Sequence, residues 1–194
     1  MKITAEFITS AAGLRDFPHD GLPEIAMVGR SNVGKSSLIN ALMRQKLART
    51  SAEPGKTRLA NIFRVQRGSS APFNLVDLPG YGYARRSKIP DSTTFEALTE
   101  AVFSRDNISG ILLVDTRHPG LDNDRAAWQW LQRAAPAALV GTKIDKLPRG
   151  QRIRALKQLE SVFENTVLPV SAVTGEGLDE LWKLIDRLAN SRQP

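Results

Sequence analysis

The sequence predicts one α/β domain with a largely parallel β-sheet. β-rich runs alternate with helical patterns along the chain, an order that is typical of parallel sheets. The 194 residues, 41% hydrophobic and 24% charged, are enough for one domain with its own core. Near the N-terminus a glycine-containing loop also leads directly from an apolar run into a helical pattern.

In the first half of the chain, "EIAMVG" (24–29) predicts a strand and "KSSLINALM", from Lys35, predicts a helix. Next, "ANIFRVQ" (60–66) and "FNLVDL" (73–78) flank the turn-rich "RGSSAP", a pattern typical of a β-hairpin. We therefore expect one antiparallel strand to join the sheet.

In the second half, "GILLVDT" (110–116) and "AALVGT" (137–142) predict buried strands, and "TVLPVSA" (166–172) predicts a further strand. Two more segments carry apolar residues at helical spacing. These residues are Phe95, Leu98 and Val102 in the first segment and Leu178, Leu181, Trp182, Ile185 and Leu188 in the second. We interpret both stripes, and Trp128 and Trp130, as core packing rather than ligand contacts.

The composition excludes several kinds of site. Without cysteine there is no disulfide, thiolate metal ligand or cysteine nucleophile, and two histidines are too few for a histidine-rich metal cluster. No apolar run approaches the roughly 18 residues of a membrane span, and "MKITAEFITS" lacks the apolar core of a signal peptide. We expect a cytoplasmic protein with no membrane partner and, because no exposed apolar stripe is evident, a monomer.

The charge is unevenly distributed. The 27 Lys and Arg residues against 20 Asp and Glu give a formal net charge of +7, which attracts polyanions. Two segments concentrate this charge: Arg44, Lys46, Arg49, Lys56, Arg58, Arg64 and Arg67 in the first, and Arg149, Arg152, Arg154 and Lys157 in the second. Either segment alone is equally well explained as a solvated face. Together they favour an RNA-containing partner.

The segment "GRSNVGKS" (29–36) matches G-x-x-x-x-G-K-[ST] between a strand and a helix, the context in which this motif binds phosphate. Its glycines let successive backbone N–H groups point inward, beside the positive end of the helix. Lys35 is expected to contact the β- and γ-phosphates, and the Ser36 hydroxyl to bind Mg²⁺.

Two later segments would complete the phosphate end of the site. In "DLPG", the Asp77 carboxylate would hold Mg²⁺, directly or through water, and Gly80 would donate its backbone N–H to the γ-phosphate. In "PGKTRL", the Thr57 hydroxyl would complete the magnesium shell, although a threonine at such a position is also consistent with an ordinary loop.

The guanine end is predicted from "TKID" (142–145), which follows the strand "AALVG". Asp145 can accept hydrogen bonds from guanine N1–H and the 2-amino group, a pattern that adenine cannot match. The stem of Lys143 would lie over the purine, and Ala172 in "SAVTGEG" would contact guanine O6 through its backbone. Asp145 therefore disfavours an ATPase.

Together these motifs resemble the EngB family of ribosome-biogenesis GTPases over nearly the whole chain. The most specific segments are "VGRSNVGKSSLINAL", "PGKTRLANIF", "DLPGYGYA", "LLVDTRHPGLDND" and "GTKIDKL". The resemblance implies a Ras-like P-loop fold, with a six-stranded mixed sheet and helices on both faces. It also implies binding of GTP or GDP with Mg²⁺, GTP hydrolysis, assembly of the large ribosomal subunit, and an indirect link to septum formation in cell division.

The resemblance also assigns the parts of the chain. Residues 1–21 would be an N-terminal extension packed on a GTP-binding domain (22–194). The residues that would bind the nucleotide are Gly29, Arg30, Ser31, Asn32, Val33, Gly34, Lys35 and Ser36 in the phosphate loop, Gly55, Lys56, Thr57, Arg58 and Leu59 in the first switch, Asp77, Leu78, Pro79 and Gly80 in the second switch, and Thr142, Lys143, Ile144, Asp145, Ser171, Ala172 and Val173 around the base. The magnesium ligands would be Ser36, Thr57 and Asp77.

Two positions depart from the broader GTPase pattern. Thr142 stands where many relatives outside the family have an asparagine that ties the guanine loop to the phosphate loop, and we expect threonine to do so less fully. Tyr81, in "DLPGYGYARR", stands where many GTPases have a water-positioning glutamine. We therefore expect slow intrinsic hydrolysis, at or below about 10⁻⁴ s⁻¹, and we assign no catalytic base; Lys35 and Thr57 would support phosphoryl transfer.

Something else must then complete the hydrolytic site. The candidates are K⁺ bound by Asn32, a ribosomal partner sensed through Arg85, Arg86 and Lys88, and His118 acting on the water. The role of Arg117 stays open. Two functions remain: a GTP-hydrolysing assembly factor bound to the large subunit or its precursor, or a GTP-gated module that binds RNA or protein and hydrolyses GTP only incidentally.

Overall fold

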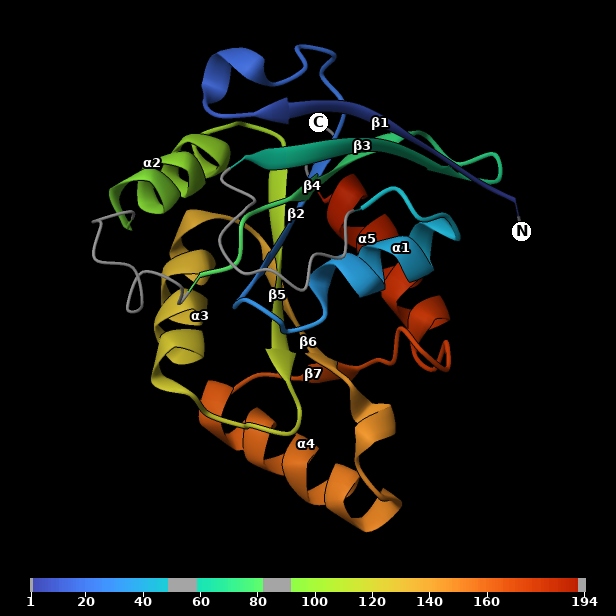
Figure 1. Ribbon diagram of the computed structural model, residues 1–194, viewed down its shortest axis with the longest axis vertical. Helices are drawn as coiled ribbons and strands as arrows, with labels where there is room; N and C mark the ends of the chain where they lie inside the picture. The colour runs from blue at the N-terminus through green and yellow to red at the C-terminus, as the bar shows by residue number, and fades with distance from the viewer. Residues whose placement is uncertain (1, 49–58, 82–91, 192–194) are drawn as a thin grey trace.

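The computed structural model describes residues 2–48, 59–81 and 92–191 (Figure 1). Within these residues one sheet of seven strands has the order β1-β3-β4-β2-β5-β6-β7. The strands are β1 (Ile3–Ala11), β2 (Glu24–Gly29), β3 (Ala60–Arg67), β4 (Phe73–Asp77), β5 (Ile108–Asp115), β6 (Ala137–Thr142) and β7 (Val167–Pro169). β3 is antiparallel to both of its neighbours, and the other pairs are parallel. The α/β class with a single antiparallel strand is therefore confirmed.

β1 makes the sheet one strand wider than the six strands that we expected. It pairs with β3 from Ile3↔Arg67 to Ala11↔Ala60, so this part of the N-terminal segment is an edge strand of the sheet. The β-branched residues of "ITAEFITSA" suit a strand, and pairing with β1 covers what would otherwise be an open edge of the β3–β4 hairpin.

Helices cover both faces of the sheet, as expected (Figure 1). They are α1 (Lys35–Met43), α2 (Ser92–Phe103), α3 (Asp122–Ala134), α4 (Arg149–Phe163) and α5 (Leu178–Asn190), with short 3₁₀ turns η1 (Leu14–Asp16) and η2 (Ile144–Lys146). α2, α3 and α4 pack on one face and α1 and α5 on the other. None of the helices in the described residues combines the length and apolarity needed to cross a membrane.

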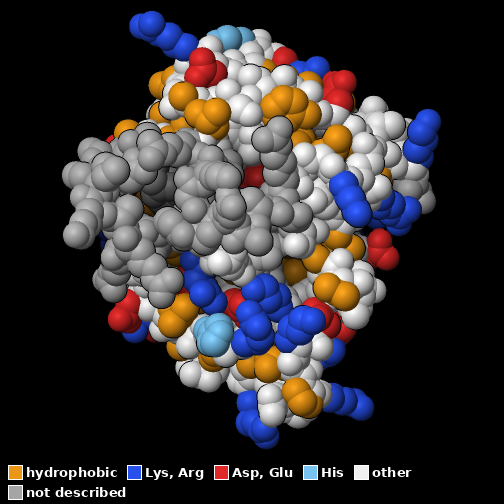
Figure 2. All heavy atoms as spheres, in the orientation of Figure 1, with side chains coloured by type: hydrophobic (Ala, Val, Ile, Leu, Met, Phe, Trp, Pro, Cys, Tyr) orange, Lys and Arg blue, Asp and Glu red, His pale blue; other side chains and the backbone are white. Residues whose placement is uncertain are grey.

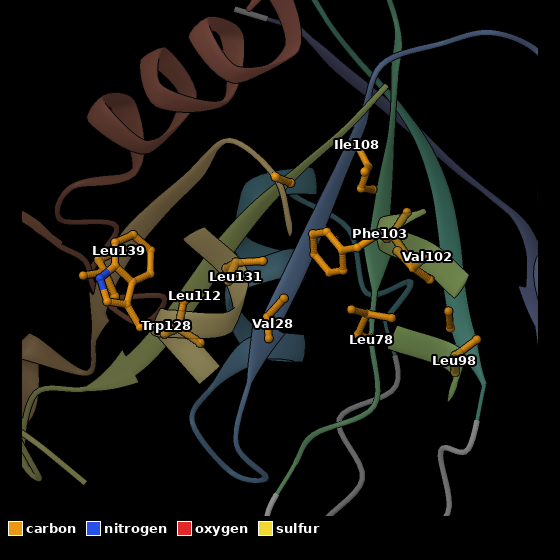
Figure 3. Packing of buried hydrophobic residues seen from close by; sticks show 14 of the residues in the cluster. Val28, Leu78, Leu98, Val102, Phe103, Ile108, Leu112, Trp128, Leu131 and Leu139 are labelled. Atoms are coloured by element: carbon orange, nitrogen blue, oxygen red, sulfur yellow. The ribbon is translucent and has the colours of Figure 1, made fainter. Parts of the chain in front are cut away.

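The predicted apolar stripes lie in these two cores. Leu98, Val102, Trp128, Leu181, Trp182 and Ile185 are buried, and Trp130, Leu178 and Leu188 are partly buried against them. Figure 3 shows the first core, where Val28 of β2, Leu78 just after β4 and Leu112 of β5 lie among side chains of α2 and α3. The side chain of Phe95 lies outside the described residues.

The topology brings four loops to one edge of the sheet. β2, β4, β5 and β6 are parallel neighbours, so their carboxyl ends lie together. Ligands of open α/β sheets bind outside this edge. The segments that leave it are those in which the sequence placed the phosphate motif, "DLPG", "DTRHPG" and "TKID".

Candidate functional site

The phosphate loop has the strand–loop–helix context that the sequence predicts. It leaves β2 at Gly29 and enters α1 at Lys35. Gly34 has a φ of 103°, which favours glycine, and Asn32 is left-handed, with a φ of 64°. The Val33 side chain is buried, and its N–H donates to Arg30 O at 3.2 Å. The loop is therefore tightly curled.

Lys35 and Asp77 meet at the mouth of this loop. The Lys35 Nζ forms an ion pair with Asp77 Oδ1, and the two side chains are only 11% and 6% exposed. Asp77 ends β4, and Ser36 follows Lys35 in the first turn of α1. The structure thus brings together the ammonium group and the carboxylate that the sequence assigned to the phosphates and to Mg²⁺.

The start of the second switch lies along the phosphate loop. Tyr81 N–H donates to Gly29 O at 3.2 Å, and Ser31 N–H donates to Tyr81 O at 3.1 Å. A Cβ at Gly80 would lie 2.8 Å from the Ser31 nitrogen, so only glycine fits there. Residues 78–81 thereby continue the pairing of β4 with β2.

Tyr81 has a partner that the sequence analysis missed. Its hydroxyl donates to Asp124 Oδ1 at 2.7 Å, and Asp124 lies buried on α3. Burial and the nearby Asp124 charge raise the pKa of Tyr81, and burial also raises the pKa of Asp124. The sequence signal was an acid one helical turn before Trp128, on the buried stripe of α3. The tyrosine is therefore anchored to α3.

Thr142 connects the guanine loop to the phosphate loop. Its buried hydroxyl lies 2.7 Å from Val33 O and 3.2 Å from Val114 O, so one donor serves two carbonyl groups. We expected threonine to make this connection less fully than asparagine. The structure shows that the hydroxyl does reach the phosphate loop.

Ser171 holds the carboxylate that was assigned to guanine. Its hydroxyl donates to Asp145 Oδ1 at 2.7 Å and accepts backbone N–H groups of Val173 and Thr174 at 3.2 and 3.1 Å. Burial acts to raise the pKa of Asp145, but the hydrogen bond from Ser171 and the charge of Lys146 outweigh it and lower that pKa. Asp145 is thus an ionised acceptor at neutral pH.

Some of the other predicted site residues lie outside the described part of the chain. Residues 55–58 of the first switch, with Thr57, and the basic residues at 85, 86 and 88 lie outside the described part of the chain. Leu59 is exposed and Ile144 is buried. His118 is exposed at the surface, and its backbone N–H donates to Asp115 O at 2.9 Å.

Comparison with known proteins gives the family of the chain. A family model described as "50S ribosome-binding GTPase" matches residues 24–143. The "Probable GTP-binding protein EngB" of Pelotomaculum thermopropionicum is 45% identical over 195 residues, covering 96% of each chain.

Solved structures of GTPases share the fold. Era in complex with MgGDPNP and a segment of 16S ribosomal RNA matches with a TM-score of 0.74 and 25% identity, over 89% of this chain and 58% of that one. A "probable GTP-binding protein engB" matches with a TM-score of 0.68 and 24% identity, over 87% of this chain and 100% of that one.

Replacing Thr142 with valine should weaken GDP binding about five- to tenfold, because Val33 O loses its donor and a lost buried hydrogen bond costs about 1 kcal/mol. Titration with a fluorescent GDP analogue measures this change. Thr142→Ser keeps the hydroxyl and should bind within about twofold of the parent. Equal affinities for Thr142→Val and Thr142→Ser would show that the contact does not support the site.

Replacing Tyr81 with phenylalanine should lower the free energy of unfolding by about 1–3 kcal/mol, because buried Asp124 loses a donor. The folded-state pKa of Tyr81 is raised, so its contribution is full below the unfolded pKa of about 10 and declines at higher pH. The difference in the free energy of unfolding between the parent and Tyr81→Phe should therefore become smaller above pH 10. Urea denaturation between pH 7 and 11 measures this difference. A difference that does not change with pH would contradict a buried, hydrogen-bonded Tyr81 hydroxyl.

Proposed function

The chain is a GTPase of the EngB family of GTP-binding proteins, and from this premise we propose that it acts in the cytoplasm in assembly of the large ribosomal subunit. The observation that carries the proposal is the match of residues 24–143 to a family described as ribosome-binding. Near-full-length similarity to EngB supports it. A requirement in cell division would then follow indirectly, through ribosome supply.

At the phosphate end, we propose that the loop amides and Lys35 bind the β- and γ-phosphates. Ser36 and Asp77 offer the hydroxyl and carboxylate oxygens that Mg²⁺ prefers, and the described residues contain no cluster of three or more His, Asp or Glu side chains that suits another metal. When bound there, Mg²⁺ would neutralise charge on the phosphates. Thr57 would add a third ligand.

At the base end, Asp145 would read guanine N1–H and the 2-amino group. Its contact with Ser171 fixes one oxygen, and the lowered pKa keeps it charged. Ala172 would contact O6 through its backbone. This arrangement favours GTP over ATP because adenine has neither an N1–H nor a 2-amino group to donate to the carboxylate.

Hydrolysis would need a group other than Tyr81 to complete the site. Tyr81 donates its hydroxyl to Asp124, which commits the side chain at the usual glutamine position to α3. We therefore propose that the intrinsic rate is slow and that a ribosomal partner or K⁺ completes the site.

Some of the described basic residues form ion pairs within the fold, and others are exposed to solvent. In the first segment, Arg64 pairs with Asp20, and Arg67 lies near Asp186 and over the Trp182 ring. These guanidinium groups are therefore occupied within the fold.

Three of the four basic residues of the second segment are exposed on α4, whereas Arg152 pairs with Glu176. Arg149, Arg154 and Lys157 are exposed, and the first turn of α4 contains no acid. Figure 2 shows Lys and Arg side chains gathered over the lower half of this view, where Figure 1 places α4 and the loops after β5 and β6. Exposed cations on one helix suit a polyanion, and Arg149 also lies at the positive end of α4, so we propose that these residues contact rRNA.

Potassium dependence is tested by GTP turnover in matched potassium and sodium buffers. Asn32 is exposed on the phosphate loop, and we expect turnover about tenfold faster in potassium, with the difference lost in Asn32→Ala. Asn123→Ala, at an exposed position on α3, should retain it. Equal rates in both buffers, unchanged by Asn32→Ala, rule out this cation site.

Ribosomal partnership is tested by co-sedimentation with large subunits in potassium buffer. A non-hydrolysable GTP analogue should pellet the protein and GDP should not. Arg154→Gln/Lys157→Gln should weaken pelleting several-fold, because two phosphate contacts are lost. The matched control, Lys183→Gln/Arg187→Gln on the mixed-charge surface of α5, should not.

No pelleting in either nucleotide state would exclude the mature subunit as partner and leave the nucleotide site unaffected. Acceleration of hydrolysis by subunits distinguishes an assembly GTPase from a GTP-gated binding module, which would pellet without a change in rate.

A further inference from the structure

Asp115, at the carboxyl end of β5, is a buried acid that three cations contact. Its side chain is 1% exposed. Arg117 donates to it from Nε at 2.9 Å, from Nη2 at 2.8 Å and from its backbone N–H at 3.1 Å. Lys143 Nζ donates to Asp115 Oδ2 at 3.1 Å, and Arg30 Nη2 lies 3.5 Å from the same oxygen.

These three cations come from three different loops. Arg30 belongs to the phosphate loop, Arg117 to the loop after β5, and Lys143 to the guanine loop. Burial acts to raise the pKa of Asp115, but the hydrogen bonds from Arg117 and Lys143 outweigh it and hold that pKa below its ordinary value. A buried carboxylate persists only when it is paired in this way.

The Lys143 side chain lies across the phosphate loop, and its ammonium group is held at the far end. Lys143 has a φ of 61°, in the left-handed region that non-glycine residues rarely adopt. Its stem crosses the phosphate loop, since a Cβ on Gly34 would lie 3.4 Å from Lys143 Cε. The ammonium group then reaches both Asn32 O and the Asp115 carboxylate.

We propose that Asp115 is a positioning residue of the nucleotide site: it holds the Lys143 ammonium group against the phosphate loop, so that the lysine stem is already in place to pack on the purine. Arg117, whose side chain is 38% exposed, supplies the opposite charge that lets the carboxylate remain buried. This role concerns nucleotide binding alone and does not depend on the proposed ribosomal partner.

The test compares GDP affinities of purified variants by fluorescent-nucleotide titration. Asp115→Asn should raise the Kd for GDP about tenfold, as expected for loss of a charge-assisted hydrogen bond. In a Lys143→Ala background, Asp115→Asn should raise the Kd for GDP by less than about twofold, because the two residues act as a unit. Asp122→Asn, which removes a fully exposed carboxylate on α3, is the matched control and should leave the Kd unchanged.

Inosine diphosphate separates positioning from direct base reading. Inosine lacks the 2-amino group from which Asp145 would accept a hydrogen bond. The Lys143 stem packs on the purine face and does not sense that group. Asp115→Asn should therefore weaken GDP and inosine diphosphate by the same factor. A Kd for GDP within about twofold of the parent, or an undiminished effect in the Lys143→Ala background, would overturn the proposal. A changed ratio of the two affinities would overturn it as well.

Thermal unfolding in the absence of nucleotide is the control that shows whether each variant folds. If Asp115→Asn does not fold, the paired variant Asp115→Asn/Arg117→Gln removes the carboxylate together with its nearest cation. It should fold and still bind GDP about tenfold more weakly than the parent. Parent-like affinity in the paired variant would refute the role of Asp115.

Discussion

The site depends on three carbonyl groups of the phosphate loop that accept hydrogen bonds from other segments. Gly29 O accepts from Tyr81 N–H, Asn32 O from the Lys143 ammonium group, and Val33 O from the Thr142 hydroxyl. A curled loop that turns carbonyls outward turns N–H groups inward, where an anion binds. The contacts that join the loops thus also fix the phosphate cradle.

The same edge of the sheet concentrates buried acids, and each has its own partner. Asp77 pairs with Lys35, Asp115 with Arg117 and Lys143, and Asp124 with the Tyr81 hydroxyl. Because an unpaired buried carboxylate is costly, these partners constrain where the loops can lie. We therefore expect a substitution at Asp77 or Asp115 to disturb both the placement of the loops and the binding of the nucleotide.

The sequence predicted the parts of the site whose signal is local. β2 (Glu24–Gly29) and α1 (Lys35–Met43) occur with the expected bounds because apolar runs, glycines and the phosphate motif specify them within a few residues. The contacts that join the loops are not local: Thr142 bonds a carbonyl 109 residues away, and Tyr81 an acid 43 residues away. β1 was not counted as a strand because its partner, β3, lies far along the chain. The pairing of Arg64 with Asp20 and of Arg67 with Asp186 likewise joins distant residues, so the run of basic residues alone does not reveal it.

Tyr81 shows how the fold bears on catalysis. A side chain at the glutamine position can orient water only if its polar atoms are free to face the γ-phosphate, and here the hydroxyl is used to bond a buried acid on α3. The bond anchors the second switch where it leaves the sheet, beside the phosphate loop. Stability at this point and rapid intrinsic hydrolysis therefore place opposite demands on one residue. This conflict is consistent with the proposal that a bound ion or a ribosomal partner completes the hydrolytic site.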